Sequence, residues 1–303
     1  MRDPFTQVAQ DASQPAGTLK SWVGRHPYVS ALLIFVYFET FFLLLHFFLN
    51  AVIKVLHLPF LQYTLIGEVL LALVVAVPII VLGWWSEAGF TRGINGRGVV
   101  VCIMPIVLVV LPVLLGLPAI VGRASISMII TTAALVLLVG FVEEGLCRGL
   151  LLRSLLPGGI WVSVLLSSLL FAGLHLANIL SGLPWNYVAG QLLIAFGSGV
   201  LFAAIRLRTR SIWPSLLMHA AHDFPGILLL AIEPDLALSV SLNLALIVNG
   251  VFCALFLLNA LVLLRPGQVQ RLRIVYGLAP IAPPSGTPLY QLPPYPGYEP
   301  EPH

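Results

Sequence analysis

Eight apolar runs in this chain are each long enough to cross the hydrocarbon core of a membrane, which takes about 20 helical residues. They lie at about 28–52, 65–85, 98–117, 125–148, 160–180, 187–205, 212–232 and 238–264. Lipid offers an open backbone no hydrogen-bonding partner, so each run is predicted to be a helix. Only 9% of the residues are charged, against about 25% in an average soluble domain. The sequence therefore predicts an all-α, polytopic membrane helix bundle with about eight transmembrane helices.

The segments outside these runs divide the chain into three regions. Residues 1–27 are predicted to be a polar cytoplasmic tail, because they contain no apolar stretch that could serve as a cleavable signal peptide. Residues 28–264 are predicted to form the transmembrane bundle. Residues 265–303 are predicted to be a proline-rich, disordered cytoplasmic tail, since nine of the 23 prolines fall between Pro280 and His303.

The distribution of Lys and Arg predicts the orientation of the bundle. With the N-terminus in the cytoplasm, two basic residues outside the motifs, Lys54 and Arg123, lie on the far side of the membrane. Twelve lie on the cytoplasmic side: Arg2, Lys20, Arg25, Arg92, Arg97, Arg153, Arg206, Arg208, Arg210, Arg265, Arg271 and Arg273. The positive-inside rule thus places both termini in the cytoplasm. With no organelle signal visible, we expect a multi-pass protein of the bacterial inner membrane that binds no nucleic acid.

Charged side chains gather at the end of the fourth apolar run, in "FVEEGLCRGL" at 141–150. On a helix, Glu144 and Arg148 lie one turn apart on one face and can pair. Glu143 points about 100° away from Glu144. This geometry predicts one carboxylate with a structural partner and one that is free to act as a general base. The alternative is an ion cluster at the cytoplasmic helix end.

Two further runs carry histidines. In "FAGLHLAN", His175 follows Phe171 by one turn, and Asn178 could fix the tautomer of its ring. A lone histidine on an apolar helix is otherwise a packing residue.

In "SIWPSLLMHAAHDFPG", His219 and Asp223 share a face, and His222 lies on a slightly different one. The alternative for this pair is a proton relay or an ion path.

Six other side chains within the apolar runs are predicted to be structural. Glu39, His46 and Glu68 have no obvious partner one turn away, although Glu39 could contact the site. The three cysteines have no paired spacing that would suggest a disulfide or a metal site, so each is predicted to be a small core residue. They are Cys102, Cys147 and Cys253.

Converging inside the bundle, the three groups would form a polar cavity suited to water activation and oxyanion stabilisation in amide hydrolysis. The chain contains neither HExxH nor GxGD, and "FGSG" at 196–199 lacks the first glycine of GxSG. These absences argue against the site-2, presenilin and rhomboid types. The order EExxxR, FxxxH, HxxxD resembles the CAAX protease and bacteriocin-processing (CPBP, or Abi) family of intramembrane proteases over about residues 125–232.

This resemblance implies a membrane-embedded endopeptidase whose site opens to the cytoplasm. Glu143 and His175 would activate the water, and His219 with Asp223 would stabilise the oxyanion. Glu144 and Arg148 would support the site. The family has been described both as metalloproteases and as glutamic proteases. We predict no cofactor; a zinc-dependent mechanism would use His175, His219 and Asp223 as ligands.

Two questions stay open at this point. The competing function is a non-catalytic membrane transporter or regulatory scaffold that uses the same buried polar network. The partners expected of a protease are the lipid bilayer and a peptide or protein in or at the membrane. The second question is whether Glu143 and His175 lie at the same depth in the membrane, because a straight count places Glu143 near the cytoplasmic side and His175 toward the far side. They could meet if residues 149–160 lie at the interface and the fifth helix starts later.

Overall fold

The computed structural model describes residues 18–57 and 59–278, and every regular element in these ranges is helical. Eight helical spans are long and apolar enough to cross a membrane, which confirms the predicted fold class. Six of them are single helices: α3 (Pro27–Leu56), α4 (Phe60–Val81), α5 (Gly96–Val121), α9 (Trp185–Thr209), α10 (Trp213–Ile232) and α12 (Leu242–Leu263). The fifth span joins α8 (Ile160–Leu174) to a 3-10 turn, η3 (His175–Ile179). Short helices α2 (Leu19–Arg25), α11 (Pro234–Leu238) and α13 (Pro266–Val275) flank them.

The fourth span is composite and longer than predicted. It begins as α6 (Ile126–Glu144) and widens into a π-helical segment, η1 (Gly145–Leu151). It then continues through α7 (Leu152–Leu155) and a 3-10 turn, η2 (Leu156–Gly158). The prediction that this span ends at residue 148 was wrong, because Leu150, Leu151 and Leu155 are buried in the core and hold the chain in helical form for ten more residues.

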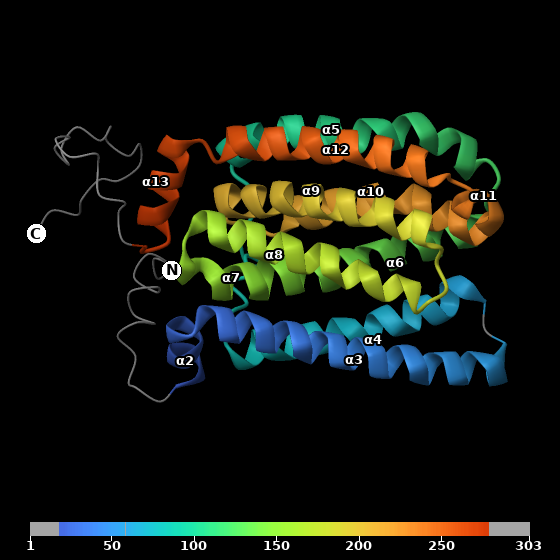
Figure 1. Cartoon of the computed structure of the whole chain (residues 1–303), viewed down its shortest axis with the longest axis horizontal. Coiled ribbons are helices and arrows are strands. Elements are labelled where there is room, and N and C mark those ends of the chain that lie inside the picture. Colours follow the sequence, from blue (N-terminus) through green and yellow to red (C-terminus); the bar gives the residue numbers. More distant parts are fainter. Residues whose placement is uncertain (1–17, 58, 279–303) are drawn as a thin grey trace, which may run out of the picture.

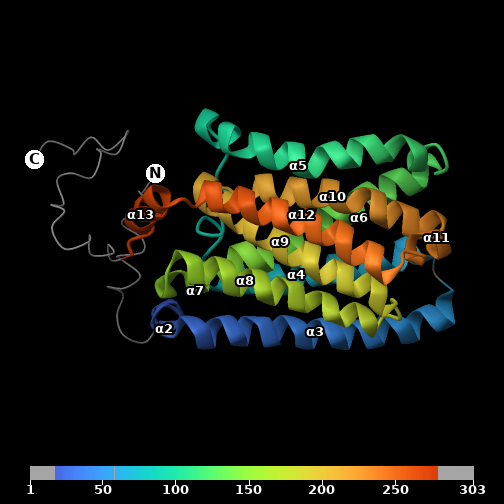
Figure 2. The same cartoon turned by 45° about the horizontal axis from the view of Figure 1, so that its top comes forward.

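The long helices run side by side, with α2, α7 and α13 at one end and α11 at the other (Figures 1 and 2). We call the first the basic end, since it carries most of the described Lys and Arg residues. These are Lys20, Arg25, Arg92, Arg97, Arg153, Arg206, Arg208, Arg210, Arg265, Arg271 and Arg273. The far end comprises His57, Pro59 and the segments 122–125, 180–184 and 233–241, the last of which contains α11. Arg123 forms an ion pair there with Glu233.

Helix α9 lies between α8 and α12 and is the most buried of the long helices. Its glycines make this close packing possible. A Cβ on Gly197 would lie 2.7 Å from Cys253 Cα, and one on Gly199 would lie 2.9 Å from Ser168 Cβ. Small residues at helix contacts let backbones approach one another inside membranes. The three cysteines are free and buried, as predicted.

The segment between α4 and α5, residues 82–95, folds back against the bundle at the basic end. Its backbone carbonyls accept hydrogen bonds from the α9–α10 region: Arg206 Nε to Ala88 O at 3.0 Å, Ile212 N to Gly89 O at 3.2 Å and Trp213 Nε1 to Phe90 O at 3.0 Å. Its Trp84 and Ala88 side chains are buried. We call residues 82–95 the α4–α5 segment. The prediction that the second span reaches residue 85 was wrong, because α4 ends at Val81.

Helix α13 corrects the prediction that disorder begins at residue 265. Proline suits the first turn of a helix, and no proline follows Pro266 within α13. Val269 and Leu272 pack into a buried cluster with Leu152 and Ile160, so apolar burial orders this segment. The remaining parts of both predicted tails, residues 1–17 and 279–303, lie outside the described residues.

Candidate active site

The two carboxylates at the end of α6 have different surroundings. Glu144 is fully buried, and its Oε1 lies 3.1 Å from Nη1 of Arg148, whose side chain is 1% exposed. This is the predicted pair one turn apart. Arg148 also donates from Nη2 to the carbonyl of Gly199 at 3.3 Å, and its guanidinium lies 4.5 Å from the ring centroid of Phe171. The pair is therefore enclosed by α8 and α9 and sealed from solvent.

His219 on α10 joins this pair to the other acidic residues. Its Nδ1 donates to Glu144 Oε1 at 3.0 Å, and its Nε2 lies 3.3 Å from both Glu143 Oε2 and Asp223 Oδ2. The predicted shared face of His219 and Asp223 is thus present. The expectation that Glu143 is free of partners was wrong, because α10 packs against α6 and brings the imidazole to it. Each ring nitrogen therefore has a carboxylate beside it that can accept a proton.

Glu143 and Asp223 are more exposed than the buried Glu144. The side chain of Glu143 is 24% exposed and that of Asp223 is 26% exposed. His222, placed by the sequence on a different face, contacts Asp223 through Nδ1 and Oδ1 at 3.1 Å. Glu143 Oε2 is nevertheless buried and makes no hydrogen bond of good geometry within the described part of the chain. An oxygen in this state is available to a water molecule or a substrate group.

His175 lies at the point where α8 gives way to a 3-10 turn, η3 (His175–Ile179). Its Nδ1 lies 3.0 Å from the carbonyl oxygen of Phe171. A carbonyl can only accept, so Nδ1 must carry the hydrogen, and Nε2 of the neutral ring is left with a lone pair. Asn178 does not fix this tautomer as suggested, because its amide donates to Gln191 Oε1 at 2.8 Å.

Glu143 and His175 lie at a similar depth because the hairpin between their helices is symmetrical. Glu143 precedes Gly159 by 16 residues, and His175 follows it by 16. Gly159 makes the turn with φ of +107°, in the left-handed region that favours glycine. The sequence suggested that the fifth helix would have to start late, but α8 starts at Ile160 and the preceding span is longer instead.

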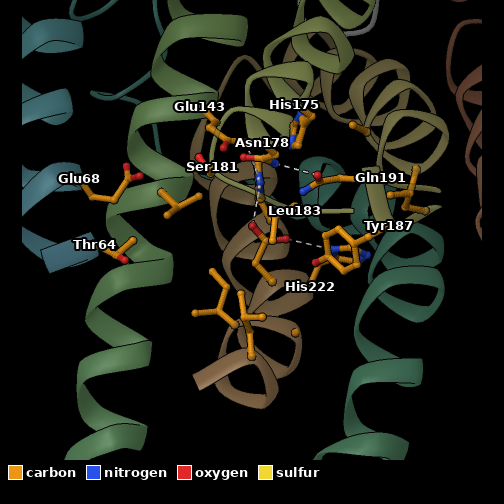
Figure 3. Close-up of a pocket in the computed structure, with 18 of the residues that line it drawn as sticks. Thr64, Glu68, Glu143, His175, Asn178, Ser181, Leu183, Tyr187, Gln191 and His222 are labelled. Carbon is orange, nitrogen blue, oxygen red and sulfur yellow. Dashed lines mark hydrogen bonds and ion pairs between the residues drawn. The ribbon is translucent and has the colours of Figure 1, made fainter. Parts of the chain in front are cut away.

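A cavity of about 620 Å³ connects these residues (Figure 3). Four predicted catalytic residues line it, namely Glu143, His175, His219 and Asp223. Glu144 and Arg148 do not line it and lie behind His219. No hydrogen bond or ion pair is found between His175 and the other three.

The cavity also contains residues to which the sequence assigned no role. Glu68 on α4 and Gln191 on α9 face it together with Glu143 and His175 (Figure 3). The sequence could have identified Glu68, because an ionisable residue inside a membrane span is a functional candidate by default. His46 has the partner that the sequence did not identify, Asn50, at 2.9 Å. Glu39, which was expected to be able to reach the site, is not among the lining residues.

The residues of the alternative zinc set, His175, His219 and Asp223, all line the cavity. No group of three or more His, Cys, Asp or Glu side chains in residues 18–57 and 59–278 is arranged to hold a metal ion. His219 and Asp223 contact each other directly, and His175 is hydrogen bonded elsewhere.

Residues 125–225 match the family model described as type II CAAX prenyl endopeptidase Rce1-like. This region comprises 101 of the 303 residues and contains all three motifs. The resemblance to CPBP proteases is confirmed for this part of the chain. No curated protein matches the chain, and no solved structure does.

Proposed function

We propose that this chain, which carries an Rce1-like domain at residues 125–225, is an intramembrane endopeptidase of the CAAX-protease-like type. One observation carries the proposal: the buried Glu144–Arg148 pair holds His219 by Nδ1, so that Nε2 is directed to two carboxylates that line a cavity. The carboxylates, imidazoles and enclosed space are the components that amide hydrolysis within a membrane requires.

Water activation is assigned to Glu143 and His175. Glu143 has an oxygen without a well-formed hydrogen bond, and His175 has an Nε2 lone pair; both residues line the cavity. A water molecule held between them would give a proton to Glu143 as its oxygen attacks the peptide carbonyl carbon. The same proton would then pass to the amine that leaves, so that Glu143 ends the cycle as it began.

Oxyanion stabilisation is assigned to His219, supported by Asp223. A proton on Nε2 can be donated to the oxygen of the tetrahedral intermediate, and a donor fixed in advance stabilises that charge without reorganising. Glu144 and Arg148 are positioning residues, because they reach the reaction only through His219. Asp223 contacts both His219 and His222, so it orients this side of the site.

The mechanism is proposed to be independent of metal. Purified protein treated with a chelator should cleave a peptide library at an unchanged rate, and added zinc should not raise that rate. Loss of cleavage on chelation with recovery on addition of zinc would instead assign ligand roles to His175 and His219, because ligands hold a metal only as a complete set.

Glu143→Gln is the test of the assigned base. The substitution keeps the shape and removes the acceptor of the water proton, so cleavage should fall at least about a hundredfold. Glu39→Gln makes the same change outside the cavity and should keep the parent rate, and melting in detergent should show both variants folded. Cleavage by Glu143→Gln near the parent rate would overturn the assignment of Glu143 as the base, whereas absence of cleavage by the parent protein would favour a transporter or scaffold.

The setting of the reaction is part of the proposal. The expected location is a bacterial inner membrane with both termini in the cytoplasm, and the expected substrate is a peptide or protein in or at the membrane. Alternation of the eight spans and the gathering of basic residues at one end support this orientation.

A further inference from the structure

We propose that the peptide reaches the site from the far end of the bundle, and that the substrate is therefore an extracytoplasmic segment of a protein. The identity of the occupant as a peptide rests on the proposed function. The direction of access does not, because it follows from where the cavity lies and where the bundle is closed.

Below the site, the basic end is filled with side chains. The π-helical segment and α7 contribute Leu146, Leu150, Leu151 and Leu155, each at most 1% exposed. The α4–α5 segment adds Trp84 and Ala88 to the same core cluster. Arg206, Ile212 and Trp213 tie this segment to α9 and α10 through backbone carbonyls. A core packed in this way leaves no path for water or a peptide from the basic end.

Above the site, the cavity wall continues to the far end. It includes Asn50 near the end of α3, Thr64 near the start of α4, Ser181 in the turn after η3, and Val240 before α12. Asn50 and Ser181 are exposed. The cavity thus runs from Glu143 toward the turns of the far end, and several of its labelled polar residues are visible in Figure 3.

Two expectations from the sequence are now in conflict. Eleven Lys and Arg residues place the basic end in the cytoplasm, whereas the family resemblance implied a site open to the cytoplasm. Both cannot hold when the cavity reaches the far end. The charge distribution is a property of this chain's own residues and acts directly on insertion, so we give it precedence.

Cysteine labelling tests the direction without any requirement for activity. The three native cysteines are buried, so they give little background with a charged maleimide that does not cross membranes. Ser181→Cys probes the rim, Thr64→Cys the deeper wall, and Gly267→Cys the basic end. A Cβ at Gly267 meets nothing within 4 Å. In intact bacterial cells the first two should be labelled, and Gly267→Cys only after the membrane is permeabilised.

Three labelling results would overturn the proposal. Labelling of Gly267→Cys with protection of Ser181→Cys would mean that the orientation is reversed. Labelling of Thr64→Cys only after permeabilisation would mean that the cavity is filled from the basic end. No labelling of Thr64→Cys from either side would mean that the cavity is closed.

A peptide library separates this proposal from the proposed function. If labelling succeeds and no library member is cleaved, the proposed function fails while the direction of access stands.

Discussion

The two sides of His219 use the same chemical groups in opposite surroundings. On the Nδ1 side, the Glu144 carboxylate pairs with Arg148, and both side chains are sealed beneath aromatic rings and the backbone of α9. On the Nε2 side, Glu143 and Asp223 have no Arg or Lys among the contacts found, and each is about a quarter exposed at the cavity wall. Two adjacent glutamates thus have different tasks because α6 turns one inward and the other toward the cavity.

The difference teaches how a hydrolytic site can be rigid and reactive at once. A buried ion pair costs much to desolvate, and replacing it with apolar groups is often neutral for stability. Here the pair holds one nitrogen of His219 in place, which leaves the other to face the cavity in a defined direction. Substitutions on the sealed side are therefore expected to lower the stability of the fold, and substitutions on the open side to change the turnover number. A substitution of His219 should affect both.

Arg148→Ala should have the largest effect, and it falls on the sealed side. It leaves Glu144 buried without its cation, a change that typically costs about 3–5 kcal/mol of folding free energy. Unfolding in detergent should show this loss. Arg123→Ala is the matched control, because it removes the Arg of an exposed Arg–Glu pair and should cost no more than about 1 kcal/mol. Equal melting temperatures for Arg148→Ala and the parent would mean that the pair does not hold the site.

His219→Ala should come next, since it removes the residue that both sides share. Loss of one oxyanion donor lowers kcat about 10²–10³-fold, and KM should change less because the contact forms mainly in the transition state. Steady-state kinetics on a cleaved peptide would measure the two constants separately. A variant with unchanged kcat and a raised KM would assign His219 to substrate binding instead.

Asp223→Asn should have the smallest effect and lies on the open side. The amide keeps the hydrogen-bonding shape near His219 and His222 but cannot carry charge, so cleavage should be retained within about tenfold. The pH dependence of turnover should change. Complete loss of activity, with stoichiometric zinc in the parent and none in the variant, would make Asp223 a metal ligand and remove the metal-independent mechanism.

The sequence predicted those features that depend on spacing along one helix. The eight spans, the Glu144–Arg148 pair and the shared face of His219 and Asp223 all follow from local periodicity. Features set by contacts between distant segments were missed. The approach of His219 to Glu143 depends on how α10 packs on α6, and the folding back of the α4–α5 segment depends on carbonyl acceptors for Arg206 and Trp213.

The π-helical segment after the two glutamates makes the position of Glu143 relative to His175 depend on the number of residues between them. Such a segment accommodates an extra residue within a helix and is often found where function resides. Deleting one residue from Gly145–Leu151 would close the wide turn and leave Glu143 one residue closer to Gly159 than His175 is. The two side chains would then be offset by about 1.5 Å, the rise of one helical residue. A misplacement of about 1 Å can cost about a hundredfold in rate, so a single-codon deletion here should be more damaging than most substitutions.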